Sequence, residues 1–225
     1  MIDINIRTAI EAQLLGCRTV VVEARTSFTR NNVLKLWKYL IEDLKMLGVK
    51  KLYGKFASGN INHISIKVLQ TTLLKICCML GIQVYTGVKF LDLCEPEDDI
   101  GWHAKLLPED HEARHFSFDV VVGASGKTVN LHGFNRYKMD AKLAIAITCN
   151  FVNDGSKDEA YVNEISGVQK QYHQQFFAKL DEAHGIKLEN IIYYKDSTHY
   201  FVMTATKDSL LNRGVLRESH EDRAR

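Results

Sequence analysis

The chain has 225 residues, of which 46% are hydrophobic and 25% charged, so it can bury the core of one large or two small globular domains. A formal net charge of only +2 excludes the strong positive field that marks a nucleic-acid binder. Five cysteines without a C-x-x-C pair indicate a reducing compartment, and no apolar run approaches the roughly 18 residues that span a bilayer.

The spacing of apolar residues, together with the glycines that end helices, predicts the helices and strands of the first half of the chain. A helix is expected over Arg7–Leu15, followed by a strand over Arg18–Glu23. The strongest helical pattern covers Val33–Leu47, where apolar side chains recur at spacings of three and four and Asn32 favours the N-cap position. Another long helix is expected over Ser65–Leu80, with the serine as its cap. Further strands are predicted at residues 82–86, 88–93, 102–107 and 116–123.

The second half of the chain has a more antiparallel pattern. Leu143–Phe151 alternates and is expected to be a strand, and His173–His184 has a helical pattern that ends at Gly185. The charged tail, Arg217–Arg225, has no apolar face to bury and is expected to fray. The remaining elements are a hairpin of residues 191–194 with 199–205, and a helix at residues 207–212.

This order of elements predicts an α/β fold. Residues 1–140 show the helix and strand alternation of half a doubly wound sheet, with a β meander inserted. Residues 141–218 are expected to form part of a second, antiparallel layer that faces the substrate, and residues 219–225 a frayed tail.

A carboxylate stands at the end of the first predicted strand. Three valines lead into Glu23, and a short polar loop follows. In open α/β sheets that bind dinucleotides, an acid at the carboxyl end of the second strand accepts hydrogen bonds from a ribose. The alternative is an ordinary exposed strand end.

Seven segments, in order along the chain, carry a family resemblance; they are residues 30–37, 53–56, 63–66, 142–148, 164–168, 188–196 and 198–205. Together they resemble the flavin monooxygenase domain of the MICAL proteins, enzymes that use FAD and NADPH to oxidise methionine on filamentous actin. The resemblance implies an incomplete FAD-binding, Rossmann-like sheet of the hydroxylase type. It also implies a cytoplasmic, cytoskeleton-associated parent protein that promotes filament disassembly and has further interaction domains.

The sequence departs from the family where the phosphates of FAD would bind. In the family a Gly-Ala-Gly-Pro-Cys-Gly turn precedes the first helix, whereas the first glycine of this chain is Gly16. The chain therefore looks like an internal piece of the domain, and by itself it is expected to be inactive. Two alternatives stay open: a non-catalytic actin-interaction or decoy form that lacks FAD binding, and a different aromatic hydroxylase of similar architecture.

The resemblance implies an adenosine-side set of cofactor residues. Glu23, Ala24 and Arg25 match the family's contacts there: the carboxylate would accept both ribose hydroxyls, and the guanidinium would stack on adenine or reach a phosphate. Phe90 would lie against the adenine, although ordinary strand packing explains it nearly as well.

A second set would lie toward the flavin. Arg30 would neutralise the pyrophosphate, and the amide of Asn31 or Asn32 would bond near the flavin ring. Tyr200 matches a tyrosine that contacts the flavin, and strand alternation places its neighbours on the opposite face. No residue of either set is expected to be a catalytic acid or base.

No metal site is expected. Three histidines, at positions 103, 111 and 115, fall close together in the sequence. No cysteine or carboxylate accompanies them at ligand spacing, so exposed loop histidines explain them better.

Overall fold

The computed structural model describes residues 2–49, 62–97, 100–126, 131, 133, 134, 137, 145–165, 173–195 and 197–216. The chain forms two compact units, and each is described by itself. Unit 1 comprises Met1–Arg30, Tyr39–Leu52 and Ile64–Lys138. Unit 2 comprises Asn31–Lys38, Tyr53–His63 and Met139–Arg225. The charged tail lies outside the described residues.

Two helices of unit 1 pack against each other, α1 (Ile2–Leu14) and α3 (Ile66–Met79). Their contact buries Ile6 and Cys77 completely. The Ser65 hydroxyl accepts a hydrogen bond from the Val68 backbone N–H at 3.3 Å, which confirms it as the N-cap of α3. Both predicted helices are confirmed, although α1 begins earlier than its apolar spacing indicated. Within the described ranges, no helix is long and apolar enough to cross a membrane.

The helix predicted over Val33–Leu47 is wrong in its first turn. Strand β2 (Val33–Leu36) comes first, and helix α2 begins only at Lys38 and ends at Met46. Asn32 therefore caps no helix. The apolar residues at the start of this pattern suit a strand as well as a helix, and pairing of β2 with β3 (Asn62–Ser65) decides between them.

Four strands of unit 1 form two separate pairs. Strand β1 (Val20–Glu23) runs parallel to β4 (Gln83–Thr86), as a doubly wound sheet requires. Strands β5 (Lys89–Cys94) and β6 (His103–Leu107) form an antiparallel pair, which confirms two strands of the predicted meander. A short 3-10 helix, η1 (Glu112–His115), follows.

The strand predicted at residues 116–123 is wrong. All of these residues are described, and none of them is in a strand. One backbone hydrogen bond joins the segment to the meander, from Phe118 N–H to the carbonyl of Trp102 at 2.9 Å. The run of valines at 120–122 is exposed, and it pairs with no strand of the described residues despite its β propensity.

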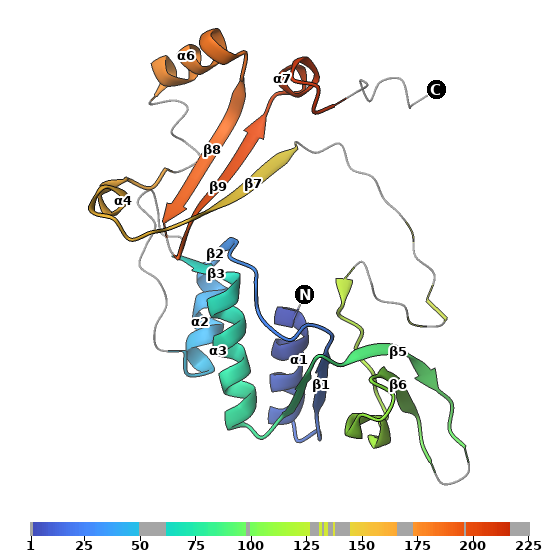
Figure 1. Cartoon of the computed structure of the whole chain (residues 1–225). Coiled ribbons are helices and arrows are strands. Elements are labelled where there is room, and N and C mark those ends of the chain that lie inside the picture. Colours follow the sequence, from blue (N-terminus) through green and yellow to red (C-terminus); the bar gives the residue numbers. More distant parts are fainter. Residues whose placement is uncertain are drawn as a thin grey trace. The chain divides into compact units, whose positions relative to one another are not determined.

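Unit 2 is built on a three-stranded antiparallel sheet in the order β7-β9-β8 (Figure 1). The strands are β7 (Ala146–Val152), β8 (Leu188–Lys195) and β9 (Thr198–Ala205). The helices are α4 (Lys157–Tyr161), α6 (Gln174–His184) and α7 (Lys207–Asn212). Its main core joins Phe177, Leu188, Ala205 and Leu210. The predicted hairpin and both predicted helices are confirmed.

Candidate functional site

Glu23 lies at the carboxyl end of β1, where the sequence placed a ribose-binding acid. It stands opposite Thr86 in the parallel pair, and its backbone carbonyl accepts from Val88 N–H at 3.0 Å. Gly87, between them, has a φ of +75°, and an added Cβ would lie 3.3 Å from Cγ2 of Thr26. A glycine is therefore needed at this turn to keep the end of β1 in place.

The Glu23 carboxylate is held by its neighbour Arg25. Oε1 accepts from both the backbone N–H and the Nε–H of Arg25, each at 2.9 Å. Burial by itself would raise the pKa of Glu23, but the hydrogen bonds from Arg25 outweigh it and hold the pKa below its ordinary value. No donor among the described residues bonds to Oε2. The site thus presents an ionised carboxylate whose Oε1 is held by Arg25.

The other candidate residues of unit 1 are exposed or pack in the core. Ala24 and the side chain of Arg30 are exposed, and the Arg30 carbonyl accepts from Lys67 N–H at 3.1 Å. Phe90 packs, together with Val22, against the buried cluster around Val88. Its ring is thus part of the core next to the end of β1.

Unit 2 brings two flavin-side candidates into direct contact. Nδ2 of Asn32 donates to the hydroxyl of Tyr200 at 3.3 Å. Tyr200 is only 5% exposed and lies between Asn150 of β7 and Tyr194 of β8 in the sheet. Asn31 is half-buried. The eight candidates therefore fall into two groups, five in unit 1 and Asn31, Asn32 and Tyr200 in unit 2.

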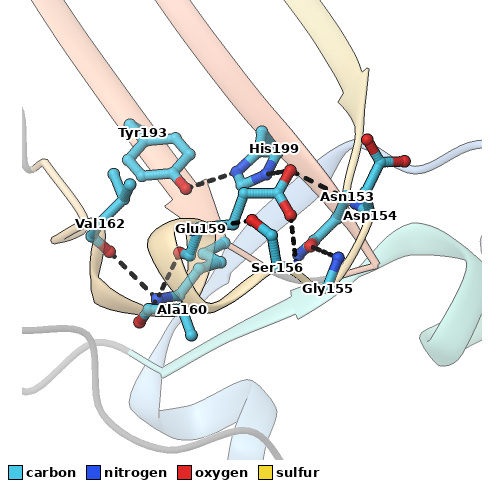
Figure 2. A network of polar contacts seen from close by, with 10 residues as sticks. Asn153, Asp154, Gly155, Ser156, Glu159, Ala160, Val162, Tyr193 and His199 are labelled. Carbon is cyan, nitrogen blue, oxygen red and sulfur yellow. Dashed lines mark hydrogen bonds and ion pairs between the residues drawn. The ribbon is translucent and has the colours of Figure 1, made fainter.

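The opposite face of the same hairpin carries a polar network that the sequence reasoning missed (Figure 2). The Tyr193 hydroxyl lies 2.6 Å from Nδ1 of His199, and Nε2 of His199 lies 3.1 Å from Oε1 of Glu159. Tyr193 is 1% exposed, and the network joins the hairpin to α4. The spacing of Ser156 and Glu159, which form a capping box, was the available signal.

Hydrogen bonds of the network connect α4 to the hairpin at both ends of the helix. At its start, Oε1 of Glu159 meets Nε2 of His199 on β9, while Oε2 accepts from the Ser156 backbone N–H at 2.8 Å. At its end, Nζ of Lys195 donates to the carbonyl oxygens of Ala160 at 2.6 Å and Val162 at 3.1 Å. A cation is favourable there, because the last carbonyls of a helix carry partial negative charge.

The network should make unit 2 sensitive to acid. Hydrogen bonds from the Ser156 backbone, with a further bond from His199, lower the pKa of Glu159 from 4.5 to about 2. Because the folded pKa is depressed, the stabilisation is complete above about pH 4.5 and is lost as the pH falls toward 2. In urea unfolding across this range, the stability advantage of the wild type over Glu159→Gln should shrink as the pH falls. A constant difference would contradict the assignment.

Comparison with known proteins places these residues in context. A family model described as "Mical, Rossman domain" matches residues 143–225. The chain is 53% identical over 223 residues to human F-actin monooxygenase MICAL2, covering 97% of this chain and 11% of that protein. It is 54% identical over 218 residues to zebrafish F-actin monooxygenase mical1, covering 97% of this chain and 18% of that protein. The chain thus spans less than a fifth of the length of these relatives.

Two further similarities were found. A zebrafish protein-methionine sulfoxide oxidase, mical3b, is 52% identical over 222 residues, covering 97% of this chain and 13% of that protein. Among solved structures, the crystal structure of an MHPCO mutant has a TM-score of 0.49 and 11% sequence identity, covering 91% of this chain and 56% of that chain. The Rossmann-type family match, together with the parallel pair in unit 1, confirms the prediction of an incomplete α/β fold.

Proposed function

Because this chain is a partial member of the MICAL family, we propose that it forms part of a flavin-dependent monooxygenase that uses NADPH and O2 to oxidise methionine residues of filamentous actin. The names of the relatives, F-actin monooxygenase and protein-methionine sulfoxide oxidase, support both the substrate and the reaction class. We further propose a cytoplasmic, cytoskeleton-associated parent with filament disassembly as the outcome. We propose F-actin as the partner on the same ground.

The ionised Glu23 at the end of β1 carries the proposal for this chain. Its Oε2, to which no donor in the described ranges bonds, suits a ribose hydroxyl, since a carboxylate only accepts hydrogen bonds and a hydroxyl can donate one. Arg25 orients that carboxylate and is itself 35% exposed at the side chain, so its guanidinium is within reach of solvent and of a nucleotide. The residues present therefore fit the adenosine end of FAD.

The remaining candidates extend the same assignment. Arg30 offers an exposed cation to the pyrophosphate, and Phe90 supports the adenine side through the core cluster. Asn32 and Tyr200 form the hydrogen-bonded pair assigned to the flavin side. When bound, FAD supplies the redox chemistry, so these groups have to bind and orient the cofactor and keep water out, rather than move protons.

The colour of the purified chain tests the proposal. A chain that binds FAD should show flavin absorbance near about 450 nm, in a stoichiometric amount after the addition of FAD and removal of the excess. In the full-length parent protein, NADPH should then bleach that band without air, and oxygen should restore it. A colourless chain that still sediments with actin filaments would favour the non-catalytic actin-interaction form instead.

A further inference from the structure

One face of the β8–β9 hairpin carries a pair of stacked tyrosines. Tyr194 and Tyr200 are directly opposite each other in the strand register, with ring centroids 6.3 Å apart and ring planes inclined by 11°. Their exposed fractions are 2% and 5%, and Val33 and Val202 are among the side chains packed against the pair. Tyr200 therefore has no broad ring face open to a planar ligand.

The hydroxyl of Tyr200 has a hydrogen-bond partner outside the tyrosine pair. Asn32 donates to it through Nδ2 at 3.3 Å. Because an amide NH2 group only donates, the phenol oxygen accepts this bond and keeps its own hydrogen. The described contacts offer no acceptor for that hydrogen. The Tyr200 hydroxyl thus keeps a hydrogen that it can donate.

Tyr194 also contacts a third ring. The His63 ring stacks on it with centroids 5.1 Å apart and planes inclined by 30°. Burial raises the pKa of Tyr194 to about 12, so the ring stays neutral near neutral pH. Tyr194 is therefore the middle ring of three, in contact with both His63 and Tyr200.

We propose that Tyr194 is a positioning residue that stacks on Tyr200 and fixes its ring, so that Tyr200 offers its hydroxyl rather than its face to the flavin. The inference rests on the proposed function, because the family resemblance directs Tyr200 to the flavin. Tyr194 touches no ligand in this assignment and acts only through its neighbour.

The hairpin supplies a matched control on its opposite face. Tyr193, the residue before Tyr194, stacks on Phe201 with centroids 4.6 Å apart and is also almost fully buried. Tyr193→Met and Tyr194→Met therefore remove the same ring from the same strand, but only the second removes the stack on Tyr200. Each variant is first checked for a folded circular dichroism spectrum.

Tyrosine nitration tests the positioning without any flavin. The purified full chain is treated with tetranitromethane, and peptide mapping follows the modification of Tyr200. Tyr200 should be protected in the wild type, in Tyr194→Phe and in Tyr193→Met, and should react several times faster in Tyr194→Met. Equal protection in Tyr194→Met and the wild type overturns the proposal, as does equal loss of protection in Tyr193→Met. If Tyr194→Met fails to fold, His63→Leu takes its place. A smaller acceleration of Tyr200 nitration is then expected, and the absence of any acceleration would overturn the proposal.

Titration with FAD tests the consequence for the cofactor. Quenching of flavin fluorescence gives the Kd, which should rise roughly 2- to 10-fold in Tyr194→Met, the range expected for loss of one aromatic pair. Tyr194→Phe should bind as the wild type does, because it keeps the ring. An unchanged Kd in Tyr194→Met overturns the proposed effect on the flavin. If the wild type binds no FAD while nitration follows the expected pattern, the positioning of Tyr200 stands and the cofactor assignment fails.

Discussion

Glu23→Ala should weaken FAD binding by roughly 10- to 100-fold, the largest effect expected of any single change at the adenosine side. The change removes a charge-assisted hydrogen bond to a ribose hydroxyl, worth about 1.5–3 kcal/mol. Oε1 is already committed to Arg25, so the estimate counts one bond through Oε2. Isothermal titration with FAD would measure the change.

Two further variants separate this effect from a general loss of structure. Glu23→Gln keeps an acceptor but not the charge, so its Kd should fall between those of the wild type and Glu23→Ala. Glu42→Ala removes an exposed carboxylate of α2 that pairs only with Lys45 among the described residues, and it should leave the Kd unchanged. If Glu23→Ala bound FAD as tightly as Glu42→Ala, the ribose assignment would be lost.

Tyr193→Ala should lower the free energy of unfolding of unit 2 by about 3–5 kcal/mol, as truncation of a buried aromatic residue does. The side chain is 1% exposed, stacks on Phe201 and holds His199 through its hydroxyl at 2.6 Å. The change therefore leaves a cavity and also deprives Nδ1 of His199 of its partner. Urea unfolding followed by circular dichroism would measure the loss.

The hydroxyl and the ring of Tyr193 can be separated. Tyr193→Phe keeps the packing and should cost about 1–3 kcal/mol, because a partly buried ring nitrogen loses its hydrogen bond. Tyr161→Ala is the matched control, since Tyr161 lies in the same unit at 84% exposed and should change stability by less than about 0.5 kcal/mol. A Tyr193→Ala effect as small as that of Tyr161→Ala would refute the structural role of the network.

Local signals predicted most of the elements. Ser65 capped its helix as expected, because a cap needs only the next few backbone N–H groups. The hairpin of β8 and β9 was found because its strands are close in sequence and rich in β-forming residues. Val33–Leu36 was misassigned, because its partner β3 lies too far along the chain for its own pattern to show.

The site was only partly predictable for the same reason. The family resemblance assigns both Asn32 and Tyr200 to the flavin. Nothing in the sequence, however, shows that these residues, 168 positions apart, are hydrogen-bonded to each other. The contact of His199 with Glu159 also spans 40 positions. Such pairs depend on how strands are placed side by side, and single-sequence periodicity carries no information about that placement.

The contacts of α4 make this short helix dependent on the hairpin. A five-residue helix cannot hold its shape in water, since one turn costs more conformational entropy than its few internal bonds return. Its stabilising partners, Lys195 and His199, take up their positions only when the two long strands have met. We therefore expect α4 to depend on the folded hairpin and to be lost whenever the two strands separate.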